Sequence, residues 1–296
     1  MPRLTAYGPT GLGVAALLAA PTVQAHAPEA RWGIDPWVAV PLVVLMAVYL
    51  RGWLGSPRRR GGGGRVAAFW LGCATLAVAL LGPMEAWAEE GLAAHMIQHM
   101  LLIGVAAPLL VLAWPGPVLL RGLPNPWRRA VVYGAVALRG PWSWATRLAV
   151  ASLLHAAVIW LWHAPPAFDA ALSNRALHTL EHLSFVLSAV LFWWAVRVAT
   201  VRGEAGAAGL WILFTMIHMG LLGALLTFAP APLYGYHEPL PFGFTALEDQ
   251  QLAGLVMWVP AGAVYLGAGL AVLGYWLTRA GRNCEPARPS GRAKRA

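Results

Sequence analysis

Histidines at helical spacing are the residues of this chain best suited to chemistry. His95 pairs with His99 and His178 with His182, each pair four residues apart, so the two partners lie on one face of a helix. Both pairs stand at the start of a long apolar run. Histidine is costly in hydrocarbon, so intramembrane copies indicate function, and we expect a transition-metal site here. Glu181, inside the second pair, could act as a ligand or fix an imidazole tautomer.

Methionines accompany the first histidine pair. Met96 and Met100 form a second pair at the same spacing, rotated by about one residue around the helix. Imidazole and thioether together suit copper, and the thioether favours Cu(I). The alternative is that the methionines pack against lipid while the histidines bond to neighbouring helices. Single histidines in other apolar runs, which could join the same metal site, are His155, His163 and His218.

Enzyme motifs are weak or missing in this sequence. The order HxxEH at residues 178–182 matches a zinc-protease motif, but that motif also needs a downstream acidic ligand and a water-filled site. We find no CxxC, no phosphate-binding glycine loop and no GxSxG at a strand-to-helix turn. The sequence therefore does not predict an enzyme.

The composition predicts the fold class. Hydrophobic residues make up 59% of the 296 and charged residues 11%, against about 25% charge in soluble domains. In lipid, each backbone N–H and C=O group must be hydrogen-bonded within its own segment, so apolar runs of this kind form helices. A helix needs about 20 residues to cross a bilayer. We expect an all-α polytopic membrane helix bundle of about seven transmembrane helices. The predicted spans are 37–54, 66–83, 92–113, 147–163, 178–198, 207–229 and 250–277.

The arginines predict the orientation of the bundle. The loops after the first, third and fifth spans, together with the C-terminal tail, hold 18 of the 21 basic residues. The positive-inside rule makes these segments cytoplasmic, with the N-terminus outside and the C-terminus inside. The net charge of +9 therefore follows from topology and does not predict nucleic-acid binding. All nine histidines fall outside the predicted cytoplasmic loops.

The two ends of the chain differ in character from the spans. A basic Arg3, an apolar core and a small-x-small site ending at Ala25 resemble a cleaved signal peptide. Cleavage after Ala25 would leave His26 as a terminal chelate for Cu(II), whereas cleavage after Ala27 or none would leave it idle. The predicted division is a signal peptide at 1–25, a seven-helix domain at 26–281 and a basic disordered cytoplasmic tail at 282–296.

Several motifs together resemble the CtaG-type cytochrome c oxidase assembly factors. The most specific are HxxxH at 95–99 followed by Ala107-Pro108, and HxxEH at 178–182 preceded by WHxP at 162–165. The stretch Phe192-Trp193-Trp194 adds to the match. The resemblance covers most of the chain, from the first predicted span to the seventh.

The resemblance implies a bacterial inner-membrane protein that matures aa3- or caa3-type oxidases by delivering or inserting copper. The expected partners are oxidase subunits, membrane lipid and a periplasmic copper donor. No substrate bond would be broken, so no enzyme is expected. Two alternatives remain open: a b-type haem clamped by two histidines from different helices, and a metal-free scaffold for oxidase subunits. The matching positions are His95, His99, His178 and His182, with weaker motif support for His155, His163 and His218.

Overall fold

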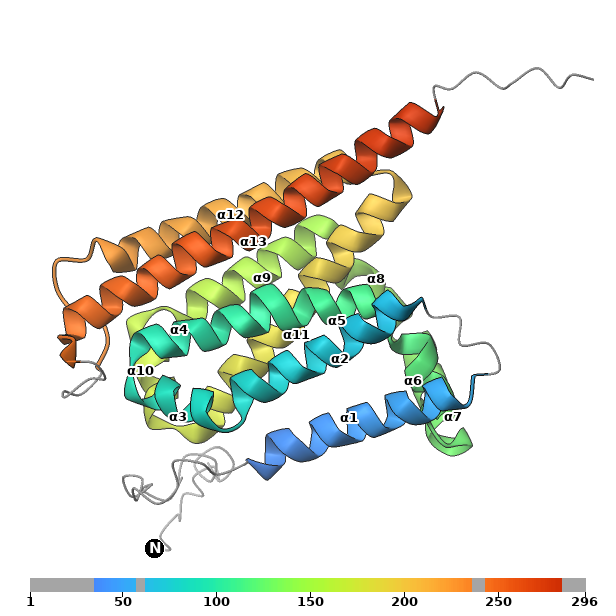
Figure 1. The fold of residues 1–296 in the computed structure, drawn as a ribbon, viewed down its shortest axis with the longest axis horizontal. Coiled ribbons are helices and arrows are strands. Elements are labelled where there is room, and N and C mark those ends of the chain that lie inside the picture. The colour runs from blue at the N-terminus through green and yellow to red at the C-terminus, as the bar shows by residue number, and fades with distance from the viewer. Residues whose placement is uncertain (1–34, 57–61, 236–242, 284–296) are drawn as a thin grey trace, which may run out of the picture.

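A computed structural model describes residues 35–56, 62–235 and 243–283 of the chain. Within these ranges the regular elements are helices and no strand is found, which confirms the predicted all-α class (Figure 1). The predicted signal peptide at 1–25, His26 and the tail beyond residue 283 lie outside the described residues.

Six helices in the described part of the chain are long and apolar enough to cross a membrane, which confirms a polytopic membrane bundle. They overlap six of the predicted spans. Five of them are single helices: α1 (Pro36–Leu54), α2 (Gly63–Leu80), α11 (Arg175–Arg202), α12 (Ala205–Thr227) and α13 (Ala246–Asn283). The sixth is a continuous helix made of three segments: α4 (Leu92–Met100), η3 (Leu101–Ala106) and α5 (Ala107–Ala113).

The fourth predicted span, 147–163, differs from the expectation. Its helix α9 (Leu148–Trp162) has 15 residues and reaches about 22 Å, less than the ~30 Å hydrocarbon core. It meets α8 (Arg139–Ala145) at a bend of 75°, and the pair makes a seventh span only as one broken helix. The chain turns at Ala164 because Pro165 starts the next helix there.

The connections between spans are also helical, which the sequence reasoning missed. A proline stands at the first or second position of four of the five short helices, where its missing N–H is no loss. Prolines between the predicted spans therefore start helices. Besides α8, these elements are α3 (Pro83–Glu90), α6 (Gly116–Gly122), α7 (Asn125–Ala137) and α10 (Pro165–Ser173).

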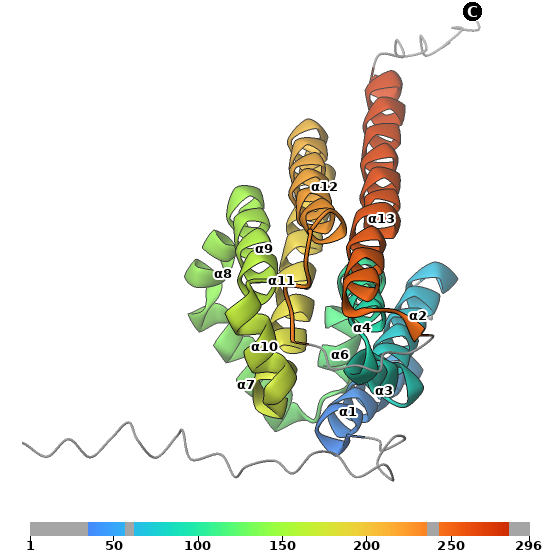
Figure 2. The same ribbon diagram turned by 90° about the vertical axis from the view of Figure 1, so that its left-hand side faces the viewer.

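The composite helix α4–η3–α5 is the centre of the bundle. It packs against α13, α2 and α11, while α12 runs beside α13 and α9 packs on α11 (Figures 1 and 2). Most buried apolar side chains form one core between these helices. The first helix, α1, is peripheral and packs on α6 and α2. An added Cβ at Gly52 or Gly122 would collide with facing backbone, so glycines permit this contact.

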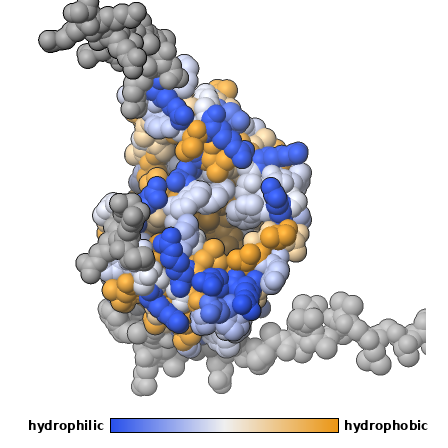
Figure 3. Space-filling view, turned by 90° about the vertical axis from the view of Figure 1, so that its right-hand side faces the viewer, coloured by the Kyte–Doolittle hydropathy of each residue, from blue (hydrophilic) through white to orange (hydrophobic). Residues whose placement is uncertain are grey.

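The two ends of the bundle differ. Helices α3 and α10 lie at one end and α6 to α8 at the other, here called the α3/α10 end and the α7/α8 end (Figure 1). Seen from the α7/α8 end, hydrophilic residues gather around an apolar hollow (Figure 3). Arg51 lies in the last turn of α1, and Arg202 ends α11, at this same end. That it faces the cytoplasm stays a prediction from the arginine distribution.

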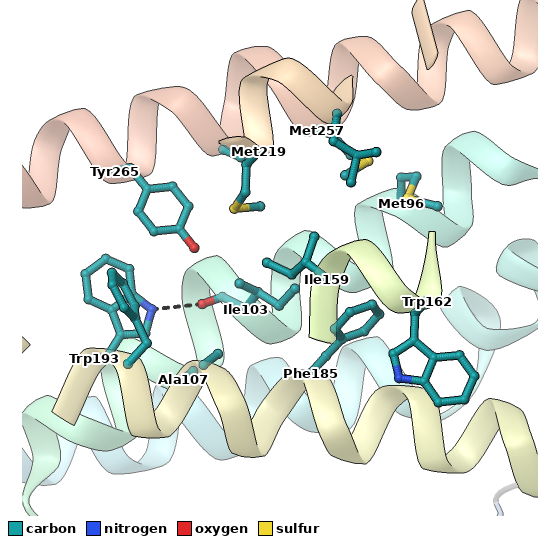
Figure 4. Close-up of a cluster of buried hydrophobic side chains, with 14 of the residues drawn as sticks. Met96, Ile103, Ala107, Ile159, Trp162, Phe185, Trp193, Met219, Met257 and Tyr265 are labelled. Carbon is teal, nitrogen blue, oxygen red and sulfur yellow. Dashed lines mark hydrogen bonds between the residues drawn. The ribbon is translucent and has the colours of Figure 1, made fainter. Parts of the chain in front are cut away.

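A π-helical turn interrupts the central helix just before Pro108. The π pattern joins each carbonyl to the N–H five residues later, and Ala107 N–H bonds to Leu102 in this way. Proline has no N–H to offer the carbonyl of Ile103. The indole of Trp193, on α11, donates to that carbonyl instead at 3.1 Å (Figure 4). The Ala107-Pro108 motif therefore follows directly on a π turn that is tied to a neighbouring helix.

Polar caps position the two helices that carry the histidine pairs. Asp249, on α13, accepts hydrogen bonds from the N–H groups of Leu92 (2.6 Å) and Ala93 (3.2 Å) at the start of α4. Asn174 caps α11 through its side-chain oxygen. Because unpaired N–H groups at a helix start are costly, these two caps fix where each helix begins. Both histidine pairs follow within the next two turns.

Candidate metal centre

Four side chains from two helices meet at the α3/α10 end of the bundle. His95 and His99 come from α4, and Glu181 and His182 from α11. One potential ligand atom from each lies within 4.8 Å of the other three. All four side chains are buried, with exposed fractions between 0 and 6%. Residues of two motifs that lie 83 residues apart in sequence are thus brought together in the structure.

The carboxylate of Glu181 lies between the histidines of α4. Its Oε2 is 3.8 Å from His95 Nε2 and its Oε1 is 3.8 Å from His99 Nε2. The ring of His182 completes the group, with its centroid 5.3 Å from that of His99. Two ligands bound to one ion at 2.0–2.1 Å are about 3.3 Å apart in a tetrahedral site and about 4.1 Å apart in a linear one. The two separations of 3.8 Å between Glu181 and the α4 histidines fall within this range.

Several of these polar atoms have no hydrogen-bond partner among the described residues. They are both carboxylate oxygens of Glu181, both ring nitrogens of His99, and His182 Nε2. A buried polar atom left without a partner costs about 1–3 kcal/mol, and a charged one costs more. A bound cation would satisfy the Glu181 carboxylate, one ring nitrogen of His99 and His182 Nε2 at once, because each imidazole offers an ion one nitrogen. The donor set therefore fits a metal ion.

His95 is oriented by the helix that precedes it. The backbone carbonyl of Ala88, in α3, accepts a hydrogen bond from the His95 side chain. Metal-binding histidines generally use one ring nitrogen in this way, which fixes the tautomer and the direction of the other nitrogen. The Nε2 atom of His95 is the one that faces Glu181.

His178 adjoins the four-residue group from the outside. Its ring centroid is 4.2 Å from that of His182 and 5.2 Å from that of His95. Its Nδ1 is 3.8 Å from Glu85 Oε1, and its side chain is 15% exposed. The resemblance placed His178 beside the other three motif histidines, and the structure brings it into contact with two of them.

Glu85 and Gln98 were not identified from the sequence. The side-chain amide of Gln98 donates to Glu85 at 2.5 Å and to the carbonyl of Ala79 at 2.7 Å, which ties α3 and α2 to α4. Burial raises the pKa of Glu85 to about 7, although the hydrogen bond from Gln98 lowers it. The signal that could have found Gln98 is its position one turn after His95, where it shares part of the same helix face.

His163 borders the group without joining it. Its ring centroid is 6.1 Å from that of His99. One ring nitrogen, Nδ1, is 2.8 Å from the carbonyl of Ile159, in the preceding turn. The hydroxyl of Tyr234 donates to the backbone carbonyl of His163 at 2.9 Å. A backbone-bonded histidine is the ordinary explanation for a lone copy, and it describes His163.

The two remaining single histidines lie outside the four-residue group. His155 Nδ1 is 3.0 Å from the hydroxyl of Ser188, and its ring stacks on Phe192. His218 lies against the ring of Phe214. The structure brings histidines of α4 and α11 together, and His163, which follows α9, lies beside them. A ligand role for His155 or His218 stays a prediction.

The predicted methionine ligands have apolar surroundings. Met96 is fully buried in the main hydrophobic core, where Met219 and Met257 also lie (Figure 4). Met100 packs against the same core. Both methionines therefore contribute to packing, and a ligand role for either stays a prediction.

Comparisons with known proteins identify a family but no solved relative. Uncharacterized proteins of Mycobacterium bovis and Mycobacterium tuberculosis are each 26% identical to this chain over 249 residues. The match covers 77% of this chain and 36% of each relative, so the chain spans about a third of their length. No solved structure matches.

The family comparison covers nearly the whole helical bundle. The model described as cytochrome c oxidase caa3 assembly factor matches residues 47–279. That range includes all four residues of the buried group and their neighbour His178. The chain therefore belongs to the family of cytochrome c oxidase caa3 assembly factors.

Proposed function

We propose that this protein binds one Cu(I) ion at His95, His99, Glu181 and His182 and delivers it to a cytochrome c oxidase during assembly. The observation that carries the proposal is the Glu181 carboxylate, which is fully buried between histidines and has no hydrogen-bond donor among the described residues. Removing a carboxylate from water without a counter-charge is unfavourable, and a metal cation supplies that charge.

Charge balance favours a monovalent ion. Burial favours neutral imidazoles, so the group carries the single negative charge of Glu181 when that carboxylate is ionised. Cu(I) would make the site neutral, whereas Zn(II) or Cu(II) would leave a net positive charge in an apolar interior. Imidazole nitrogen is a common copper ligand. The argument from thioether ligands is weaker than the sequence indicated, because the methionines have apolar surroundings.

The spacing of the rings argues against haem between these histidines. The rings that come from different helices are 5.2 Å apart between centroids for His95 and His178 and 5.9 Å apart for His95 and His182. A haem needs axial ligands on opposite faces of a wide, flat macrocycle, whereas here the Glu181 carboxylate lies beside the α4 histidines, 3.8 Å from His95 and from His99. A single small ion fits this donor group better.

The proposed setting is the bacterial inner membrane, with the α3/α10 end facing the periplasm. Copper would reach the site from a periplasmic donor and leave it for an oxidase subunit by exchange of ligands. Neither step breaks a bond of a substrate, so we propose a metallochaperone and not an enzyme. The membership of the oxidase assembly family supports an oxidase subunit as the acceptor.

The first experiment is an anaerobic Cu(I) titration of the purified protein in detergent, with bound metal counted per chain. We expect one copper per wild-type chain and a loss of binding of at least tenfold in His95→Ala and His99→Ala. The matched control is His218→Ala, which removes another buried histidine from outside the group. Equal copper binding by the wild type and a His95/His99/His182 triple alanine variant would exclude this site.

Absorbance spectra of the same preparations address the haem alternative. Protein purified from cells would show an intense Soret band if two histidines held a haem, and Cu(I) gives none. In a deletion strain, the His99→Ala variant should restore little oxidase activity unless copper is added. Full oxidase activity with that variant in copper-poor medium would favour the metal-free scaffold.

A further inference from the structure

A partly exposed pair of potential ligands covers the buried group. Glu85, on α3, is 31% exposed and His178, at the start of α11, is 15% exposed. The residues beneath them are His182 at 6%, His95 at 1% and His99 at 0%. Exposure therefore falls stepwise from Glu85 towards the centre of the group. An ion that reaches His95 from this direction passes Glu85 and His178 first.

The two side chains are placed to hold one ion together. Glu85 Oε1 and His178 Nδ1 are 3.8 Å apart, too long for a hydrogen bond and within the separation of two ligands on one ion. The other carboxylate oxygen of Glu85 accepts a hydrogen bond from Gln98. That bond fixes the carboxylate and leaves Oε1 facing the histidine.

His178 also contacts the inner group. Its ring centroid lies 4.2 Å from that of His182 and 5.2 Å from that of His95. Its second nitrogen, Nε2, is buried and has no hydrogen-bond partner within the described ranges. One side chain thus touches both the exposed carboxylate and the buried ligands.

We infer that Glu85 and His178 form an outer copper station, through which Cu(I) enters and leaves the inner site by ligand exchange. The inference rests on the proposed copper function. Moving a bare ion from water into an apolar interior is prohibitive, so each step must replace a lost ligand with a new one. Carboxylate and imidazole would capture the ion at the mouth, and His178 would pass it to His182 and His95 without change of oxidation state.

A rate measurement separates this role from a structural one. Cu(I) would be supplied as its bicinchoninate complex, and loading followed by stopped-flow loss of the complex's absorbance. Release would be followed with the chelator in excess. Glu85→Gln keeps the size of the side chain and an acceptor for Gln98, but it removes the charged ligand. The matched control is Glu89→Gln, an exposed glutamate on the same helix.

We expect Glu85→Gln to bind one copper at equilibrium and to load and release it about tenfold more slowly than wild type. Glu89→Gln should match the wild type, and Glu85→Asp should recover part of the rate. His178→Gln should slow both steps, and the double variant should be little slower than either single one. That non-additivity is the signature of one shared station.

The outcomes distinguish this inference from the proposed function. Unchanged rates in Glu85→Gln with one bound copper would overturn the outer station and leave the inner site intact. Loss of equilibrium binding in that variant would also overturn it, because Glu85 would then belong to the inner ligand set. A wild type that binds no Cu(I) would overturn both proposals. If Glu85→Gln does not fold, His178→Gln carries the same test.

Discussion

At the residue scale, the environment of Glu181 determines the character of the site. A carboxylate among imidazoles and phenyl rings can be a structural acid, a tautomer anchor or a ligand. As a helix-start acid it would be exposed, yet its side chain is fully buried. As a tautomer anchor it would accept a hydrogen bond, yet the two nearest histidine nitrogens are 3.8 Å away. The ligand role agrees with both observations.

Replacing Glu181 by glutamine should remove the stabilisation that copper gives the protein. At a free Cu(I) concentration 100 times the Kd, binding adds about 2.7 kcal/mol to the free energy of unfolding. We expect wild type to melt at a clearly higher temperature with Cu(I), and Glu181→Gln to show little or no shift at the same concentration. Thermal unfolding in detergent, with and without metal, measures both.

The control for this comparison is Glu204→Gln, an exposed glutamate at the opposite end of the bundle. The melting temperature of Glu204→Gln should rise with copper as much as that of the wild type does. A copper-dependent shift of equal size in Glu181→Gln would remove the carboxylate from the ligand set.

Residue spacing predicted part of the site and missed part. The i, i+4 pairs fix which histidines share a helix face, so His95 with His99 and His178 with His182 could be found from sequence. Whether His155 or His218 joins them depends on how far each helix is rotated and tilted against its neighbours. Glu85 could not be chosen from the other acids near it, because its role comes from the fold of α3 over the mouth of the site.

At the element scale, α4 is positioned by a residue from the far end of the chain. Asp249 of α13 pairs with the N–H groups of Leu92 and Ala93, and Gly91 at the helix start has no side chain to do so. The His95 ring lies one turn further on. Contact between α13 and α4 continues along both helices. The geometry of the histidine pair therefore depends on the last span.

Asp249→Ala should lower the stability of the protein and also weaken its copper binding. Losing a helix cap costs about 0.5–2 kcal/mol, and leaving the two amides unpaired in a buried position places the effect at the upper end. We expect a lower melting temperature without metal and a weaker affinity for Cu(I). Glu248→Ala, one residue earlier and exposed, is the control for loss of charge. If Asp249→Ala bound copper as tightly as the wild type, the position of α4 would not depend on this cap.

The sequence predicted the helices whose extent depends on hydropathy. It did not predict the feature that depends on a side chain far away along the chain. Long apolar runs gave six spans within a few residues, because the bilayer sets their length. The π turn before Pro108 needs Trp193, 90 residues away along the chain, to complete its hydrogen bonds. Nothing near Pro108 in sequence reveals that partner. The short helices were missed for a simpler reason, because the prediction rested on long apolar runs and these helices lie in the connections between them.

At the scale of the whole molecule, the candidate metal centre and the arginine-rich connections lie at opposite ends. The histidine pairs stand at the start of α4 and α11, and Arg202 is the last residue of α11 at its other end. If the positive-inside rule holds, the site opens away from the cytoplasm. That orientation suits transfer to an oxidase domain in the periplasm, and it stays a prediction.

Cysteine labelling in intact cells tests the orientation. Ser173→Cys lies on α10 at the metal end, and Arg129→Cys lies on α7 at the other end, both exposed. With Cys284 replaced by serine and the buried Cys73 retained, a membrane-impermeant thiol reagent should label the first variant and not the second. Labelling of Arg129→Cys alone in intact cells would invert the topology and place the metal centre on the cytoplasmic face.

The bond between Asp249 and the start of α4 also has a consequence for biosynthesis. These partners are 157 residues apart, so the ribosome makes α4 long before it makes the carboxylate that caps it. During translation, the turn that carries His95 lacks this cap until α13 has been synthesised. The start of α4 therefore gains its full set of hydrogen bonds only after all four residues of the buried group have been made.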